Sequence, residues 1–517
     1  MKLTFRVLLI FGCALVWMGF VSCAHAATYY VATTGNDNNP GTLAQPFRTI
    51  AKSIAVAAAD GDTVSLANGT YNEHNLDFGA KNLTLTSQSG NPALCILDCQ
   101  GLGQGIRING GQKAATVTGM TIRNGVAAAR TSTGGAMTIA HSNATVSNCV
   151  FSSCKYTFDG NLGADAICLN SAQSVTITGC TFSGNGGGNW YTRGAVAALN
   201  TNSVTLSGCA FTGNSSGGML LAITPANITD CTFTNNLNIA GGAAIETAGA
   251  VITLNRCVFT GNHANNDAAN TTGGGGALKI INGDLTLTNC LFTANTSNSG
   301  SGGITSQILV EGNVPSVMKL VNCTVIAISS RDFYHNILIR CPRFSDDSDN
   351  VTVVNSIVRG ASGIDDIFLS RGSRATVTYS NVGTDPDPKF VNPAAGNYRL
   401  QSSSPCVNAG SSSATGLPST DLDRVPRILG SAPDMGAYEL WTSNFGDWFV
   451  DKALGSDTNS GSPTAPYKTV VKAIASAGNG HKIYIKAGNY GTDKPRITKS
   501  LRLVNWGNAG QARVGKP

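Results

Sequence analysis

Charged side chains are concentrated in the stretch that begins RDFYHNILIRCPRFSDDSDN. Enzymes that cleave acidic polysaccharides by elimination need a base of suitable pKa and a cationic group that neutralises the uronate carboxylate. Arginine and histidine can fill these roles, so Arg331, His335 and Arg340 are the candidate catalytic residues. Tyr334 and Arg343 would bind the acidic sugar, since the arginine fork suits carboxylates. A solvated loop with local salt bridges explains the same residues, and we favour this second interpretation.

A glycine-rich segment, GNWYTRG at residues 188–194, combines two aromatic residues with an arginine. Trp190 and Tyr191 are able to stack on sugar rings, and Arg193 is able to pair with an acidic group. The same side chains would equally cover a corner of the core. Both interpretations stay open, and the three residues are candidates for substrate binding.

Glycoside hydrolysis needs two carboxyl groups a set distance apart, one acting as the acid and the other as base or nucleophile. One conspicuous pair is in GIDDIF, residues 363–368. Asp365 and Asp366 are adjacent, and adjacent residues of a strand point to opposite faces of the sheet. We therefore do not expect them to act together as a catalytic pair.

Two loops are rich in oxygen ligands, GNDNNPG at residues 35–41 and GSDTNSG at residues 455–461. Calcium is the one cofactor that such loops suggest, although neither has the twelve-residue frame and closing glutamate of an EF-hand loop. A hydrogen-bonded turn is the interpretation we favour. Histidine and cysteine spacings indicate no zinc site, so no metal ligands are assigned.

These side chains must be positioned by a repeated unit. GCTFSGN, residues 179–185, recurs as GCAFTGN, DCTFTNN, RCVFTGN and NCLFTAN. Its cysteine position recurs about every 30 residues, which is typical of a solenoid. The nine residues at this position are Met120, Cys149, Cys180, Cys209, Cys231, Cys257, Cys290, Cys323 and Ser356. Two residues later the chain has a large apolar residue, in the same order Ile122, Phe151, Phe182, Phe211, Phe233, Phe259, Phe292, Val325 and Val358.

A spacing of two places the cysteine and the following apolar residue on one face of a strand, so both can point inward. An upstream pair such as Val175 and Ile177 has the opposite parity. The chain must therefore turn a corner between the two strands. Three residues after the phenylalanine, five units carry an asparagine that can stack in a ladder of amides, Asn185, Asn214, Asn236, Asn262 and Asn295.

Strand, corner, strand, turn and glycine-rich return describe one coil of a parallel β-helix. A coil cannot bury its apolar face alone, so neighbouring coils stack into a continuous core. The crossover rule makes the coiling right-handed. The predicted fold is all-β, a right-handed parallel β-helix solenoid with a short N-terminal capping helix.

Cysteines are numerous, 15 in the whole chain, of which two lie in the first 26 residues. Most of the remaining 13 occupy one fixed position of the repeat. We therefore predict buried thiols stacked inside the solenoid in preference to a disulfide framework.

The first 26 residues have a basic start, an apolar centre and a small residue on each side of His25, as in a secretory signal cleaved before Ala27. An alternative is a lipoprotein signal, which would keep Cys23 as a lipidated first residue of an outer-membrane lipoprotein. Either way the sequence predicts export. Beyond this segment no stretch is long and apolar enough to span a membrane as a helix.

The net charge of the whole chain is +6, and removal of Lys2 and Arg6 with the signal lowers it to +4. Nucleic-acid binding needs clustered lysine and arginine, and for this reason we do not expect a nucleic-acid partner.

The two ends of the chain carry related modules, at residues 29–73 and 448–490. Each has two aromatic residues and a valine, a G-x-D-x-N-x-G loop, a Pro-aromatic-basic-Thr sequence, a short amphipathic helix and a G-x-Y strand. The helix is suited to cover the open edge of a first coil. The module resembles the short domain of unknown function that opens many bacterial extracellular β-helix proteins, some of them pectate-lyase-like. The second copy would cap the solenoid or begin another one.

Residues 385–439 contain DPKFVN, NYRLQSSSPCVNAG, DLDRVPR and PDMGAYE. These motifs resemble the closing segment of choice-of-anchor Q proteins. The resemblance implies an exported bacterial protein displayed on the cell surface or released from it. Members of that family typically end in a sorting signal, and this chain has the second module there.

Tetrapeptides such as GGAM (134–137) and GGAL (275–278), together with the FxxN elements, resemble the repeats of chlamydial polymorphic outer-membrane proteins. That resemblance implies surface adhesion.

The predicted organisation has five parts: a signal peptide (1–26), a cap module with the first coil (27–90), the β-helix repeats (91–384), a closing segment (385–440) and the second cap module (441–517). Two functions remain open. The first is a secreted or cell-surface protein that binds extracellular or cell-wall polysaccharide or mediates adhesion, and this one leads. The alternative is a lyase, or a glycoside hydrolase, acting on an acidic, pectin-like glycan. Fold alone does not decide between them.

Overall fold

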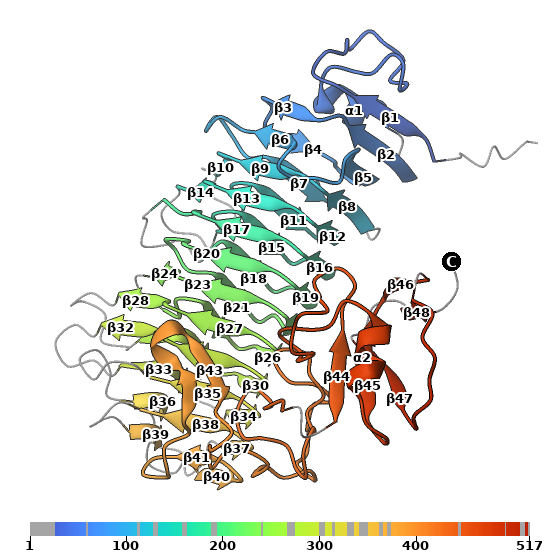
Figure 1. Ribbon diagram of the computed structural model, residues 1–517. Helices are drawn as coiled ribbons and strands as arrows, with labels where there is room; N and C mark the ends of the chain where they lie inside the picture. Colours follow the sequence, from blue (N-terminus) through green and yellow to red (C-terminus); the bar gives the residue numbers. More distant parts are fainter. Residues whose placement is uncertain are drawn as a thin grey trace, which may run out of the picture.

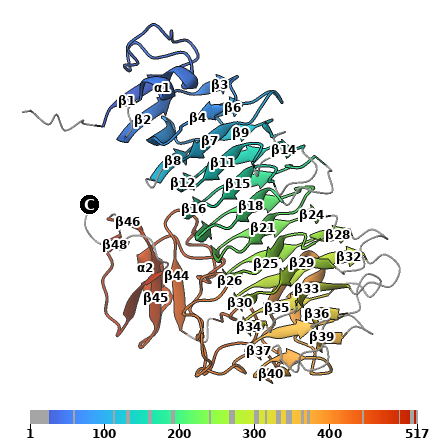
Figure 2. The same ribbon diagram turned by 180° about the vertical axis from the view of Figure 1, so that it is seen from behind.

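The protein is a long solenoid with a smaller module beside it, seen from two sides in Figures 1 and 2. The computed structural model describes residues 26–57, 60–110, 114–127, 133–157, 163–187, 194–238, 241–265, 274–298, 305–312, 316–327, 335–340, 350–360, 365–369, 374–442, 446–491, 493–506 and 512–514.

Three sheets of parallel strands form the wall of the solenoid, named here sheets A, B and C. Sheet A has 13 strands: β1 (Thr28–Val31), β2 (Asp60–Leu66), β5 (Asn82–Ser87), β8 (Ala114–Thr118), β12 (Asn143–Ser147), β16 (Ser174–Thr178), β19 (Ser203–Ser207), β22 (Ala226–Thr229), β26 (Val251–Asn255), β30 (Asp284–Thr288), β34 (Val317–Val321), β37 (Asn350–Val354) and β40 (Arg374–Thr378).

Sheet B has 12 shorter strands: β3 (Gly69–Tyr71), β6 (Cys95–Asp98), β9 (Thr121–Arg123), β13 (Val150–Ser152), β17 (Thr181–Ser183), β20 (Ala210–Thr212), β23 (Thr232–Thr234), β27 (Val258–Thr260), β31 (Leu291–Thr293), β35 (Thr324–Ile326), β38 (Ile357–Arg359) and β41 (Asn381–Val382). Each follows a sheet A strand after one corner.

Sheet C has 11 strands: β4 (Leu76–Asp77), β7 (Ile106–Asn109), β11 (Met137–Ala140), β15 (Ile167–Asn170), β18 (Val196–Leu199), β21 (Met219–Ala222), β25 (Ile245–Ala248), β29 (Gly274–Ile281), β33 (Thr305–Glu311), β36 (His335–Arg340) and β39 (Asp365–Leu369). Two small sheets lie between B and C, formed by β10 (Val126–Ala127) with β14 (Lys155–Tyr156), and by β24 (Leu237–Asn238), β28 (His263–Asn265) and β32 (Thr296–Asn298). The predicted all-β fold is confirmed.

The corner between sheets A and B is made by the residue just before each cysteine position. Asn148, Asp230 and Asn289, for example, have φ values of 48°, 57° and 53°. This left-handed conformation favours glycine, asparagine and aspartate, which explains why the chain has Gly, Asn or Asp at most of these corners. The corner produces the parity change that the sequence predicts.

The hydrophobic core is built from the residues that recur in the sequence repeat. Six phenylalanines, from Phe151 to Phe292, stack face to face with ring centroids 4.4–5.0 Å apart. All 12 cysteines among the described residues are buried free thiols, as predicted. The ladder of cysteine positions is also longer than the predicted nine. Cys95 adds a position before Met120, because the next residue, Ile96, pairs with Thr121. Ser380 adds one after Ser356, because its hydroxyl accepts a hydrogen bond from the backbone N–H of Ser356.

The predicted amide ladder is confirmed and continues beyond the five asparagines. From Asn185 to Asn262, each side-chain nitrogen donates to the side-chain oxygen of the next asparagine at 2.8–3.0 Å. Each also donates to the carbonyl of a phenylalanine, as Asn236 does to Phe211 at 3.0 Å. Asn295 donates to Gln307, which donates to Asn336 at 2.8 Å.

Helix α1 (Ile50–Val56) covers the first coil, as the amphipathic pattern predicts. Thr49 caps it by accepting the N–H of Lys52, and Glu73 accepts the N–H groups of Ile50 and Ala51 at 2.7 and 2.9 Å. These bonds satisfy the donors that a helix start leaves free.

The closing segment includes an antiparallel hairpin of β42 (Phe390–Asn392) and β43 (Asn397–Leu400), joined by the 3₁₀ turn η1 (Pro393–Ala395). It packs on the outer face of sheet B, where Leu291, Ile326 and Ile357 form a buried cluster with Tyr398 and other segment residues. Thr293 and Thr324 of the same face bond the segment, through the Tyr398 hydroxyl and the N–H of Ala437.

The C-terminal module comprises β44 (Asp447–Val450), α2 (Val470–Ser476), β45 (Lys482–Lys486), β46 (Gly488–Tyr490), β47 (Arg502–Trp506) and β48 (Ala512–Val514). Its strand orders, β44-β45-β47 and β46-β48, repeat those of β1-β2-β5 and β3-β6. The module lies beside the middle of the solenoid, not across its end (Figure 1). Of the described helices, neither is long and apolar enough to cross a bilayer.

Candidate functional site

Eight residues are predicted for the site, and most of them fall outside the described part of the chain. These are Trp190, Tyr191, Arg193, Arg331, Tyr334 and Arg343. The other two, His335 and Arg340, are the first and last residues of β36. Their backbone positions therefore locate the candidate site on sheet C.

Strand β36 lies between β33 and β39, and its register names the neighbours of the two residues. His335 pairs with Ser306 on one side and with Asp365 on the other. Arg340 pairs with Glu311. Register partners in a parallel sheet occupy the same face, so Arg340 takes the position beside an acidic residue.

Glu311 belongs to a group of charged residues on the outer face of sheet C that sequence analysis did not single out. Lys279 lies 3.3 Å from the Glu311 carboxylate, and its side chain is only 4% exposed. Glu246 is the register partner of Lys279 and is also buried. Their neighbours Ile245, Leu278 and Ile280 point into the core, which places the charged residues on the opposite, outer face. The sequence feature that could have predicted them is a single charged residue inside each of the otherwise apolar strands AAIETA and GALKII.

The same row of sheet C is apolar in the preceding coils. Cys168, Ala197 and Leu220 hold the equivalent outward positions, and all three are buried. The register continues through Glu246 and Lys279. In this row the apolar residues of β15, β18 and β21 are followed by Glu246 of β25 and Lys279 of β29, and Leu309 of β33 is apolar again.

Of the two aspartates of GIDDIF, the structure describes the side chain of Asp366, which is held by the backbone. Asp366 is buried and accepts hydrogen bonds from the backbone N–H groups of Gly360 and Gly383. Burial raises the pKa of its carboxyl group. The side chain lies in the last coil, beside the end of the amide ladder, and its bonds to backbone explain its presence structurally.

The two oxygen-rich loops are held by hydrogen bonds. The Asp37 carboxylate accepts the N–H groups of Arg48 and Thr49, each at 2.9 Å, and the Thr49 hydroxyl. Asp457 repeats this arrangement at the start of α2. The carboxylate that would bind calcium thus fastens the helix start in both modules. No cluster of three or more metal-binding side chains occurs within the described ranges.

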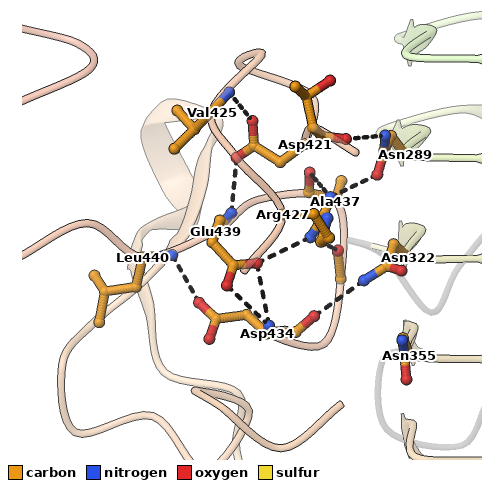
Figure 3. A network of polar contacts seen from close by, with 12 residues as sticks. Asn289, Asn322, Asn355, Asp421, Val425, Arg427, Asp434, Ala437, Glu439 and Leu440 are labelled. Atoms are coloured by element: carbon orange, nitrogen blue, oxygen red, sulfur yellow. Dashed lines mark hydrogen bonds and ion pairs between the residues drawn. The ribbon is translucent and has the colours of Figure 1, made fainter. Parts of the chain in front are cut away.

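A second polar group, drawn in Figure 3, joins the closing segment to the solenoid. Asn289, Asn322 and Asn355 occupy successive A–B corners, and their side-chain nitrogens donate to the carbonyls of Thr420, Asp434 and Ser411 at 2.7–3.0 Å. This row of corner asparagines acts as a docking strip for the segment.

Arg427 lies at the centre of this network, and its side chain is 1% exposed. It donates to the Asn289 side chain at 2.5 Å and to the carbonyl of Ala437 at 3.0 Å, and it lies 3.4 Å from the Glu439 carboxylate. Asp421 and Asp434 accept backbone N–H groups around it, from Val425 and Leu440 among others.

Three carboxyl groups therefore surround one buried cation. Burial raises the pKa of Glu439 to about 9, with the charge of Asp434 adding to the shift. Burial also raises the pKa of Asp421 to about 7 and that of Asp434 to about 6. These are residues of the motifs DLDRVPR and PDMGAYE, and in this structure they fasten the closing segment.

One further acid lies inside the solenoid. Asp165 is fully buried and accepts the N–H of Tyr156 at 3.1 Å. Burial raises its pKa to about 7. The described carboxyl groups with the largest upward pKa shifts are thus buried, and each accepts hydrogen bonds from the protein itself.

Comparison with known proteins agrees with the architecture. Residues 104–284 match the family model described as the right-handed beta helix region, and residues 453–495 match a protein family of unknown function, DUF1565. No curated protein matches the chain.

Several solved structures are similar over much of the chain. Pectate lyase Pel9A has 15% identity and a TM-score of 0.45, covering 80% of this chain and 96% of its own. A rhamnogalacturonan lyase has 14% identity and a TM-score of 0.42, covering 71% and 91%. The PL6 family alginate lyase AlyGC has 15% identity and a TM-score of 0.38, covering 85% and 63%. The three sheets and the family match together establish a right-handed parallel β-helix.

Proposed function

We propose that the protein is an exported, non-catalytic β-helix that binds polysaccharide along the outer face of sheet C. The contact region would lie along strand β36, next to the largely buried Lys279–Glu311 pair, with the predicted residues of the neighbouring connections beside it. Export and display on the cell surface belong to this proposal. They rest on the N-terminal signal pattern and on the resemblance of the closing segment to choice-of-anchor Q proteins.

The observation that favours a binding function over hydrolysis is the location of the carboxyl groups whose pKa is raised by burial. A hydrolase needs a carboxyl group of raised pKa within reach of the scissile bond. The described carboxyl groups whose pKa is raised to about 6 or higher are Asp165, Asp421, Asp434 and Glu439. All four are buried and bonded inside the fold. On sheet C, the carboxylate of Glu311 is paired with Lys279, so this described acid is engaged within the fold.

The test is an exchange of the buried pair, Lys279→Glu with Glu311→Lys. The exchange keeps an ion pair and so avoids the cost of about 3–5 kcal/mol for leaving one buried charge alone. We expect retention of the full-length protein by immobilised polysaccharides to fall about tenfold. The same exchange at the Asp98–Arg123 pair of sheet B, 2.8 Å apart, serves as the matched control and should leave retention unchanged.

Two outcomes would count against the proposal. Retention of the exchanged variant equal to that of the wild type would show that sheet C is not the contact surface. A wild-type protein that binds none of a broad panel of neutral and acidic polysaccharides would contradict the function itself.

The lyase alternative is tested separately, because His335 and Arg340 do lie on sheet C at the ends of β36. Elimination creates an unsaturated uronate that absorbs in the ultraviolet. Rising absorbance with pectate or alginate, lost in His335→Ala or Arg340→Ala, would establish the lyase. A flat trace with retained binding supports the non-catalytic protein.

A further inference from the structure

The net positive charge of the chain beyond its signal segment comes from the C-terminal module. Residues 447–514 contain ten lysines and arginines and four aspartates, a net charge of +6. That equals the formal net charge of the whole chain, also +6. The solenoid and its closing segment therefore contribute no net positive charge.

The N-terminal module provides an internal comparison, because it has the same fold. Its corresponding residues, 28–97, contain three basic and five acidic residues, a net charge of −2. The strand orders, the threonine helix caps and the aspartate turns are the same in both copies. The two modules differ by eight in net charge, because the second has seven more basic residues and one acidic residue fewer. The fold does not require this difference, so a purpose outside the fold has to account for it.

Some of the ten basic residues have structural partners. Lys482 and Lys486 pair with Asp447 and Asp451, at 3.8 and 2.7 Å. Lys499 donates to three carbonyls at the end of α2, and Lys452 donates to the carbonyl of Asn489.

The other six basic side chains are exposed, and within the part of the chain that the structure describes no ion pair holds them. They are Lys468, Lys472, Lys494, Arg496, Arg502 and Arg513.

Their placement spreads the charge around the module. Lys472 lies on α2, and Lys468 precedes its capping threonine. Lys494 and Arg496 belong to the connection between β46 and β47. Arg502 and Arg513 lie on the edge strands β47 and β48, which belong to two different sheets around one core.

The module is anchored through one face and leaves the others accessible. Phe449, Tyr484 and Val504 of the β44-β45-β47 sheet pack on Val425 and Leu429 of the closing segment. Trp506 donates to the carbonyl of Arg424 at 3.2 Å. Figures 1 and 2 show α2, β46 and β48 standing away from the solenoid.

We propose that this module binds an anionic polysaccharide through its six exposed basic residues. Charge complementarity identifies the partner as a polyanion. Because the cations lie on several elements around the module, a flexible chain can follow them, whereas a flat bilayer contacts one side at a time. The proposal goes beyond sheet C, since it gives the molecule a second contact, and two contacts on one polymer raise the overall affinity.

The experiment uses the full-length protein and polygalacturonate, with uncharged galactan as the neutral counterpart. In the test variant all six residues are replaced by glutamine. The matched control is Arg48→Gln with Lys52→Gln, which removes the charges at the positions equivalent to Lys468 and Lys472. Anionic vesicles and duplex DNA are the competing probes.

We expect the wild type to bind polygalacturonate at low ionic strength and to release it at high ionic strength. The six-site variant should bind about tenfold more weakly or worse, and the control should bind as the wild type does. Binding of galactan should be the same in all three proteins, whereas the Lys279–Glu311 exchange should weaken the binding of galactan as well as that of polygalacturonate. The last two measurements separate this proposal from the proposed function.

Equal binding of polygalacturonate by the wild type and the six-site variant would overturn the proposal. Tighter binding of vesicles or of DNA than of polygalacturonate would also overturn it and would name the partner class instead. The six positions are exposed, so the variant should fold as the wild type does, and a thermal unfolding curve matching that of the control verifies this.

Discussion

At the scale of single residues, the buried asparagines are the most demanding feature of this protein. An amide removed from water costs free energy unless each of its groups finds a partner. Asn236 meets that condition fully. Its oxygen accepts from the backbone and side chain of Asn214, and its nitrogen donates to Phe211 and Asn262. Because every amide points the same way, each bond polarises the next.

Replacement of Asn236 by alanine should therefore be costly. It leaves the Asn214 side chain, the Phe211 carbonyl and the Asn262 oxygen short of a partner, and we expect a loss of about 2–4 kcal/mol in the free energy of unfolding. Denaturant unfolding measures this loss. Asn227→Ala on the exposed face of sheet A is the control and should change stability by less than about 0.5 kcal/mol. A loss at Asn236 no larger than that of the control would refute the role of the ladder.

At the scale of elements, the closing segment is fastened by carboxyl groups that hold their protons more strongly in the folded protein than in the unfolded chain. The pKa of Glu439 is raised by burial from its ordinary 4.5 to about 9, so the folded protein holds a proton that the unfolded chain releases. The corresponding contribution to stability is complete below pH about 4.5 and is lost as the pH rises to about 9. Protonation of Asp421 and of Asp434 also stabilises the folded state. These contributions are lost over narrower pH ranges, as the pH rises to about 7 for Asp421 and to about 6 for Asp434.

We therefore expect the closing segment to become less stable between pH 5 and 9, at about 1.4 kcal/mol per pH unit for each proton involved. Limited proteolysis of residues 385–440 across this range is the measurement, with faster cleavage expected at higher pH. In Glu439→Gln the side chain cannot ionise, so the increase in cleavage rate above pH 7 should largely disappear. A cleavage rate independent of pH in the wild type would contradict the expectation.

The same segment shows what sequence analysis could and could not predict. The cysteine and phenylalanine positions recur through the nine repeats, so their inward direction follows from parity alone. The corner asparagines were visible too, since Gly, Asn or Asp precedes most cysteine positions. Their use as a docking strip was not predictable, because Asn289 bonds Thr420 across 131 residues.

The candidate site was only partly predictable for a related reason. A basic cluster in the sequence located β36 through His335 and Arg340. The charged pair that adjoins it, Lys279 and Glu311, consists of single residues in strands that otherwise read as core. Only the register of β29 with β33 brings them together.

At the scale of the whole molecule, the solenoid and the C-terminal module each have a hydrophobic core, and the two cores differ in how far they are covered. Leu85 of the first module is fully buried, because β8 of the next coil covers it. Leu503 holds the equivalent position in the C-terminal module and is 42% exposed. A pocket of about 490 Å³ lined by Ile485, Leu503 and Val514 opens at this edge. The second module is therefore a β-helix start whose core is covered on one side only.

This difference predicts two unfolding transitions in calorimetry of the full-length protein. The module buries fewer apolar side chains per residue, and it joins the rest mainly through the cluster of Phe449 and Tyr484 on the closing segment, so it should unfold first. Ile483→Ala, in the core of the module, removes about 2–5 kcal/mol and should lower only the first transition. Ile252→Ala, an equally buried change in the solenoid, should lower only the second. A single transition that both variants shift would mean that module and solenoid fold as one unit, and that the contact with the closing segment couples them fully.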